Sequence, residues 1–291
     1  MKSRFALSIG SMLVVGCSAG ESPEDGTGGS GTDTGASSSS TGAFQGTGGG
    51  NHEDCAAGTE FIYLIGQDGQ LIRFDPENVA FSPIGVLSCP NGDSPFSMTI
   101  ARDGYAWVEY SNMRLYRVDI ATAACTPTDY VPNQVGFQRF GMGMVAASPE
   151  SEETLYVADF DGVGIAKLDR QTLQLTFVGA FDQIFGAAEL TGTADGRLVG
   201  FFPSESPAVI AEIDPASGSI LSVIPQPVTA GFGWAFAFWG GDFYMFTAPD
   251  GNMSRVDRYR PSDGTTTFLV NVPTVIVGAG VSTCAPLVPP A

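Results

Sequence analysis

The sequence predicts an all-β fold, a five-bladed β-propeller, and three observations lead to this prediction. A segment that ends in an apolar residue followed by Asp recurs along the chain, its copies consist of short strands separated by turn residues, and the strand that one end lacks is found at the other. The copies are 71–76, 115–120, 165–170, 210–215 and a degenerate fifth, 256–261. Their matched positions Asp75, Asp119, Asp169, Asp214 and Arg260 are 44, 50, 45 and 46 residues apart. A repeat of this length built of short strands is typical of a β-propeller.

Four copies are complete, and each predicts four strands. The copy that begins at Phe96 predicts strands over 96–101, 105–110, 114–120 and 125–131, with Asp103-Gly104 as the first turn. The copy near Ala187 predicts strands over 189–193, 197–202, 209–214 and 220–225. The other two begin at Met142 and Trp234. The recurring Asp is best explained as a turn cap, because Asp accepts hydrogen bonds from backbone N–H groups two residues on.

The fifth blade is divided between the two ends of the chain. The N-terminal part supplies strands over 61–65, 70–75 and 81–87, and the segment 275–283 supplies the innermost strand. We therefore expect the C-terminal strand to close the ring, which removes exposed sheet edges. The alternative is an open β-sandwich whose repeats are fortuitous.

The region before the ring has a different composition, and three segments are expected: 1–17, 18–51 and 52–291. Lys2 and Arg4 precede an apolar run over 5–15, which is typical of a secretory signal and too short to span a bilayer. Residues 18–51 are mostly Gly, Ser, Thr, Asp and Ala, and predict a disordered tether. Residues 52–291 contain the propeller.

Acidic residues outnumber basic ones by 31 to 13, which gives a net charge of −18. A phosphate backbone would be repelled by such a surface, so we expect no nucleic-acid partner. Direct electrostatic attachment to anionic lipid is disfavoured for the same reason.

Five cysteines are present, and Cys17 is the one in the signal region. The other four suggest disulfides in an exported protein. Cys55 precedes the first strand of the divided blade and Cys284 follows the strand expected beside it, so we prefer the pair Cys55–Cys284. Cys89 and Cys125 then pair by elimination, or remain free thiols.

The single histidine, His52, restricts the available chemistry. Catalytic triads and multi-histidine metal sites inside the ring are excluded, and no phosphate-binding loop occurs. The candidate catalytic residue is Glu189, a carboxylate on an expected innermost strand, where it would line the central channel. There it could bind a cation, hold a sugar hydroxyl or act as an acid or base. The alternative is a structural carboxylate, either solvated in a water-filled channel or paired with an Arg.

Two weaker patterns suggest binding residues. Asp159 and Asp161, in the sequence Asp-Phe-Asp-Gly, resemble half of a calcium loop, so calcium is the one cofactor that the sequence suggests. An ordinary turn is the alternative. Trp107 and Trp239 belong either to the blade core or to an exposed rim, where aromatic rings bind sugars or peptides.

Two resemblances to known proteins follow from these motifs. The sequence Val14-Val15-Gly16-Cys17 resembles the lipobox of bacterial lipoproteins, which implies cleavage before Cys17 and lipidation of its thiol; Ser18 then favours the outer membrane. An ordinary signal peptide with an incidental Cys is the alternative. The strand ends Val118-Asp119-Ile120-Ala121-Thr122 and Leu168-Asp169-Arg170-Gln171-Thr172 resemble bacterial propellers with PQQ-like, YVTN-like or NHL-like repeats, without the repeat Trp of the quinone-binding group.

Lipobox, tether and propeller together resemble surface lipoproteins of the kind abundant in myxobacteria. The leading hypothesis for function is a monomeric, non-enzymatic binding or scaffolding lipoprotein, anchored to the membrane through lipid, that uses a propeller face to hold an envelope or extracellular protein or glycan. Two alternatives remain: a carbohydrate-active lyase or hydrolase centred on Glu189, and an envelope spacer without a ligand.

Overall fold

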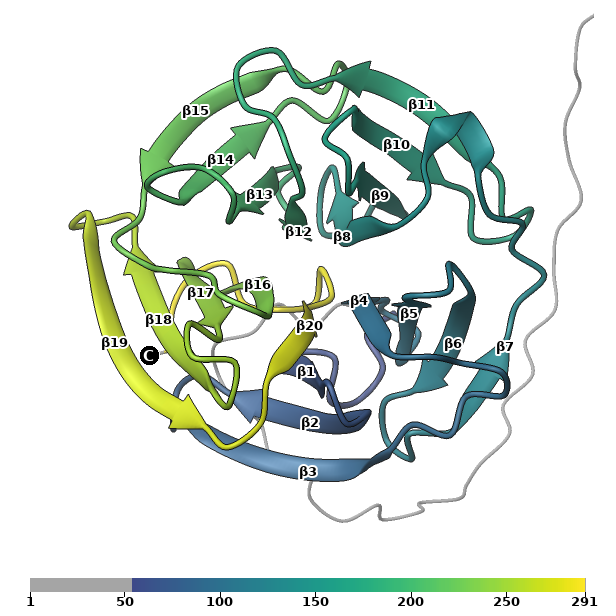
Figure 1. Ribbon diagram of the computed structural model, residues 1–291, viewed down its shortest axis with the longest axis horizontal. Coiled ribbons are helices and arrows are strands. Elements are labelled where there is room, and N and C mark those ends of the chain that lie inside the picture. The colour runs from purple at the N-terminus through teal and green to yellow at the C-terminus, as the bar shows by residue number, and fades with distance from the viewer. Residues whose placement is uncertain (1–53, 291) are drawn as a thin grey trace, which may run out of the picture. The chain divides into compact units, whose positions relative to one another are not determined.

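The computed structural model describes residues 54–290, and these form five four-stranded antiparallel sheets arranged around a central axis (Figure 1). The predicted five-bladed propeller is therefore confirmed, and the open sandwich is wrong. The signal and lipobox over 1–17 with Cys17, the tether over 18–51 and His52 lie outside the described residues. Within 54–290, no helix has the length and apolar character needed to cross a bilayer.

Each blade runs outward from an inner strand. Blade 1 is β20 (Ile276–Gly280), β1 (Ile62–Gly66), β2 (Gln70–Asp75) and β3 (Ala80–Val86). Blade 2 is β4 (Pro95–Ile100), β5 (Tyr105–Tyr110), β6 (Leu115–Asp119) and β7 (Cys125–Pro127). Blade 3 is β8 (Phe140–Ala146), β9 (Glu153–Asp159), β10 (Gly164–Leu168) and β11 (Leu175–Ala180). Blade 4 is β12 (Glu189–Gly192), β13 (Leu198–Phe202), β14 (Val209–Ile213) and β15 (Ile220–Pro225). Blade 5 is β16 (Trp234–Trp239), β17 (Asp242–Thr247), β18 (Ser254–Arg260) and β19 (Thr265–Val272), and a single-turn 3-10 helix, Gln134–Gly136, precedes β8.

The ring closes in blade 1, where the last strand of the chain pairs with the first. Strand β20 runs antiparallel to β1, from Tyr63 opposite Gly280 to Gly66 opposite Ile276. A disulfide joins Cys55 to Cys284 beside this pairing, with Cα atoms 6.1 Å apart. The expected closure and the preferred disulfide are both confirmed.

A buried polar network reinforces the closure. The Nε of Arg102 donates to Thr283 Oγ1 at 2.6 Å, and the Thr283 hydroxyl donates to Glu153 Oε1 at 2.8 Å. The backbone N–H of Arg102 donates to the other Glu153 oxygen at 2.9 Å. Blades 2 and 3 are therefore both tied to the C-terminal segment that completes blade 1.

The hydrophobic core consists of five layers, each between two neighbouring blades. In the layer between blades 1 and 5, Phe74 packs edge-on against Tyr244 and Phe246, with ring centroids 5.9 Å apart in each pair. The inner strands converge because small residues face one another: a Cβ on Gly141 would collide with the backbone oxygen of Ala188 on the next blade.

The recurring Asp residues are turn caps, as expected. Asp119 Oδ1 accepts the N–H groups of Ala121 at 2.9 Å and Thr122 at 3.0 Å, and equivalent bonds form at Asp75, Asp169 and Asp214. In the fifth copy the cap is displaced to Asp263, which accepts the Thr265 N–H, while Arg260 pairs with Asp242 at 3.2 Å.

The second disulfide joins Cys89, in the connection from blade 1 to blade 2, to Cys125 at the start of β7, with Cα atoms 5.1 Å apart. The pairing expected by elimination is confirmed, and these residues are not free thiols. Two disulfides are typical of a chain that folds in an oxidising compartment.

Candidate functional site

The ring has two different faces. The inner strands β4, β8, β12, β16 and β20 all begin at one end of the ring, which we call the Glu189 face, because Glu189 is the first residue of β12. They end at the opposite face, which we call the closure face, where the Cys55–Cys284 disulfide and the Arg102 network lie.

Glu189 is buried, with only 3% of its surface exposed. Its Oε2 accepts a hydrogen bond from the Ser97 hydroxyl at 2.9 Å. Ser97 belongs to β4, which is not adjacent to β12, so this bond crosses the centre of the ring. Burial raises the pKa of the Glu189 carboxyl well above its ordinary value, although the bond from Ser97 opposes this shift. Glu189 is therefore neither the solvated nor the Arg-paired carboxylate that the structural alternative required.

A second buried carboxyl, Glu109, lies near Glu189 and was missed in the sequence. It comes from β5, the second strand of blade 2, and its Oε2 accepts the backbone N–H of Phe140 at 2.8 Å. Its Oε1 is buried without a hydrogen-bond partner among the described residues. Burial raises the pKa of Glu109 well above its ordinary value, the Phe140 N–H lowers it, and the charge of Glu189 raises it further. The feature of the sequence that could have revealed Glu109 is an acidic residue on the same side of an otherwise apolar strand as Trp107.

Asp159 and Arg139 complete the charged groups at this end of the ring. Asp159, at the end of β9, is buried and accepts the Val163 N–H at 3.3 Å, and burial raises its pKa. Arg139 lies between two aromatic rings, with its Cζ 4.9 Å from the ring centroid of Phe96 and 4.3 Å from that of Phe160.

Calcium binding at Asp159 and Asp161 is not supported by this geometry. Gly162 N–H donates to the Asp159 oxygen in an ordinary turn, and Asp161 is exposed. Among residues 54–290, no group of three carboxylate, His or Cys side chains is placed to hold a metal ion.

A small cavity of about 100 Å³ opens at the centre of the Glu189 face, and we call it the channel-mouth pocket. Its lining comes from four of the five blades: Pro95, Phe96, Glu189, Phe232, Gly233, Trp234 and Val277. Phe232 is 80% exposed and its ring packs against Gly251, which holds it at the rim.

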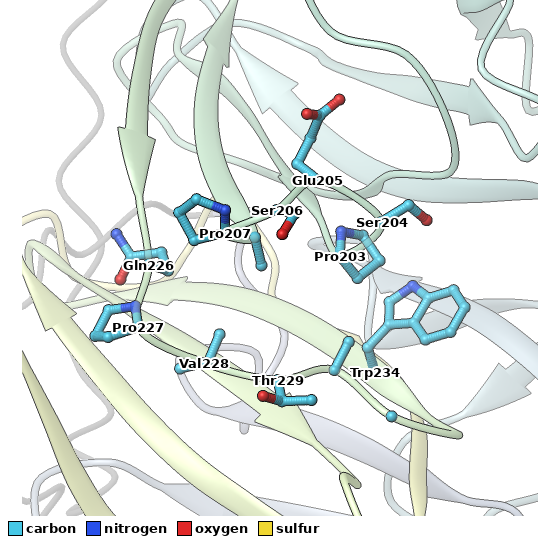
Figure 2. Close-up of a pocket in the computed structure, with 13 residues that line it drawn as sticks. Pro203, Ser204, Glu205, Ser206, Pro207, Gln226, Pro227, Val228, Thr229 and Trp234 are labelled. Carbon is cyan, nitrogen blue, oxygen red and sulfur yellow. The ribbon is translucent and has the colours of Figure 1, made fainter.

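A larger groove of about 460 Å³ lies on the same face between the loops of blades 4 and 5, and we call it the blade 4–5 groove. Figure 2 shows Trp234 beside Pro203 at one end, and Pro207 with Gln226 and Pro227 at the other. Trp234 lines both the groove and the channel-mouth pocket, so the two cavities are neighbours on this face.

The two tryptophans proposed for an exposed rim are core residues instead. Trp107 is 3% exposed in the layer between blades 2 and 3, and Trp239 is 7% exposed in the layer between blades 1 and 5. The indole N–H of Trp239 donates to the backbone oxygen of Glu60 at 2.8 Å. In each strand, the residues next to the tryptophan face the core layer on the other side of the sheet. The strand is therefore buried on both sides, and the tryptophan with it. The exposed aromatics of the Glu189 face are Phe185, 66% exposed, and Phe232, both in loops between blades.

Comparison with known proteins supports the fold. No protein-family model matches the chain, and no curated protein matches its sequence. Among solved structures it is similar to a chain of a nidogen–laminin complex, with 12% identity over 76% of this chain and 97% of that one and a TM-score of 0.52. It also resembles a chain of a mitotic checkpoint complex (12% identity, 77% and 79% covered, TM-score 0.44) and hydrazine synthase of Kuenenia stuttgartiensis (13%, 76% and 68%, 0.39). The last two are too distant to support a conclusion, and the first supports the β-propeller fold alone.

Proposed function

We propose that this chain is an exported, lipid-anchored binding module whose Glu189 face holds an envelope or extracellular protein. The observation that carries the proposal is the arrangement of this face: two exposed phenylalanines, Phe185 and Phe232, lie on the same face as the neighbouring groove and pocket. Exposed aromatics that flank a concave surface are typical of binding sites.

A protein partner is favoured over a glycan for two reasons. Three of the groove residues are prolines, Pro203, Pro207 and Pro227, and Trp234 lies at one end beside Pro203; such apolar surfaces suit extended polypeptide. The nidogen–laminin structure, to which the ring is similar, is a complex of two proteins. A glycan remains the alternative ligand.

The anchor part of the proposal rests on the lipobox resemblance at Cys17 and on the two disulfides. Lipidation at Cys17 would attach the chain to the outer membrane or cell surface, and Asp54, the first described residue, lies on the closure face. The test is incorporation of radiolabelled palmitate, which we expect in the wild type and not in Cys17→Ser. Equal labelling would refute the anchor.

The binding part is tested by cross-linking the full chain to its partner in intact cells, followed by mass spectrometry. We expect Phe185→Ser with Phe232→Ser to abolish the cross-linked partner. The matched control is Phe177→Ser with Phe268→Ser, which removes two exposed phenylalanines from outer strands. Loss in both double variants would contradict binding by the Glu189 face, and a polysaccharide array tests the glycan alternative with the same variants.

One observation favours a second candidate, a carbohydrate-active lyase or hydrolase: burial raises the pKa of Glu189, as a general acid requires. Against it, Glu109 is fully enclosed, so only one carboxyl reaches the cavity. Two-carboxylate hydrolysis needs both groups at the substrate. Polysaccharide cleavage that disappears in Glu189→Gln would establish this function.

A further inference from the structure

The channel-mouth pocket combines one buried carboxyl with aromatic and aliphatic walls. Glu189 is its charged lining residue, and Phe96, Phe232 and Trp234 supply three aromatic side chains. Its polar hydrogen-bond partner, Ser97, is uncharged and bonds one oxygen only. No Lys, Arg or His among the described residues forms an ion pair with Glu189.

This arrangement favours a cation as the ligand. A carboxylate away from water and without a counter-charge is costly, so a positive group at the pocket would remove that cost. Aromatic faces attract cations as well. Phe96 already shows this interaction on the Arg139 side, where the guanidinium lies 4.9 Å from its ring centroid.

The walls select an organic cation rather than a metal ion. Calcium requires about six to eight oxygen ligands, and the pocket offers one carboxyl group. Carbon-rich walls instead match the methylene or methyl groups of an alkylammonium. The cavity is small, about 100 Å³, which suits a small head group.

We propose that the channel-mouth pocket binds the alkylammonium group of a lysine side chain, presented by a polypeptide that lies in the blade 4–5 groove. This rests on the proposed function and identifies the chemistry that the Glu189 face recognises. Trp234 lines both cavities, and Glu189 lines the pocket, so a chain in the groove would lie next to the pocket into which its lysine side chain would reach.

Binding of a cation at Glu189 should also be coupled to the release of a proton from this carboxyl. Because burial raises the pKa of Glu189, the free protein holds a proton there that an ammonium ligand must displace. Affinity for the cation therefore rises with pH and binding releases a proton. Three further charged groups lie close together near Glu189: Glu109, Asp159 and Arg139. Glu109→Gln controls for the contribution of Glu109, the buried carboxyl on which the charge of Glu189 acts.

The experiment is a titration of the full chain with n-butylammonium chloride, which mimics the lysine side chain, at constant ionic strength. Binding is followed by calorimetry and by tryptophan fluorescence, to which Trp107, Trp234 and Trp239 all contribute. We expect butylammonium to bind, 1-butanol not to bind, and Glu189→Gln to weaken binding by about tenfold or more. Glu205→Gln is the matched control, because Glu205 lines the groove but not the pocket.

A second variant allows the proposal to be tested even if Glu189→Gln misfolds. Phe232 is largely exposed, so Phe232→Ser should fold normally and still weaken binding severalfold. Equal binding of butanol and butylammonium, or affinity unchanged in both variants, would overturn the proposal. A parallel titration uses tetramethylammonium. If it binds more tightly than butylammonium, the ligand is a methylated amine and not lysine.

Failure here is distinguishable from failure of the proposed function. If butylammonium does not bind but the cross-linked partner depends on Phe185 and Phe232, only the ammonium site is wrong. If butylammonium binds and no partner is found on this face, the pocket stands and the protein-binding function falls.

Discussion

Removing the Cys55–Cys284 disulfide should cost this ring more stability than removing Cys89–Cys125. The two bridges span sequence separations of 229 and 36 residues. In the chain-entropy model, cross-linking loops of these lengths stabilises by about 5 and about 4 kcal/mol, respectively. The native contacts at the closure, the β1–β20 pairing and the Arg102 network, stay in place in either variant. The difference therefore arises mainly from the freedom that the unfolded chain regains.

The assay is urea unfolding of the full chain with both cysteines of one pair replaced by Ala, followed by circular dichroism. With a urea slope of about 3 kcal/mol per molar, loss of 5 kcal/mol lowers the midpoint by roughly 1.5–2 M. The Cys89→Ala/Cys125→Ala variant is the matched control and should shift less. A larger shift in the control, or an unchanged midpoint in the closure variant, would refute the reasoning.

Three further predictions concern buried and capping groups. In Glu109→Gln, the free energy of unfolding should depend less on pH than it does in the wild type. Burial raises the folded-state pKa of Glu109. Its contribution to wild-type stability is therefore fully present below the unfolded pKa of about 4.5 and is lost as pH rises through the folded pKa. Chemical denaturation at about pH 4 and about pH 8 should therefore show the variant gaining on the wild type at the higher pH, and parallel curves would disprove it. Glu153→Ala removes the acceptor of the Arg102 backbone N–H and of the Thr283 hydroxyl, and it removes the carboxylate that lies 3.8 Å from the buried Arg102 guanidinium. It should therefore cost about 3–5 kcal/mol in urea unfolding, whereas a cost near zero would mean that the network is dispensable. Asp119→Ala should cost about 1 kcal/mol by the same measurement, because an exposed turn loses the oxygen that accepts two backbone N–H groups, while Asp119→Asn keeps Oδ1 and should be nearly neutral.

The fold could be predicted from the sequence because the repeat shows itself several times. Each copy carries its own turn residues and alternation, so the strand ends in 105–110 and 220–225 coincide with β5 and β15. The closure and its disulfide followed from counting strands: one blade lacked an inner strand, and one strand was left over. Arg260 broke the pattern because a nearby Asp263 could cap the turn in its place.

The site was harder to predict because its partners come from different blades. Glu189 could be placed on an inner strand, but neither Ser97 across the ring nor Glu109 on a second strand is near it in sequence. From the sequence, Trp107 and Trp239 could not be assigned to the core or to the rim. Their strands are apolar and buried on both faces, so no polar–apolar alternation shows which way a side chain points. Phe232 was missed because it stands in a loop outside the repeat.

The division of blade 1 between the two ends of the chain also determines when the ring can close. A ribosome makes β1 more than 200 residues before β20, the strand that pairs with its free edge. Until those last residues arrive, the first blade stays incomplete and the channel stays open on one side. Four blades can assemble during synthesis, yet Ser97 and Glu189 meet in a fixed geometry only when the ring is shut. A chain cut short before residue 276 would keep nearly all of its repeats and lose the structure that holds its site.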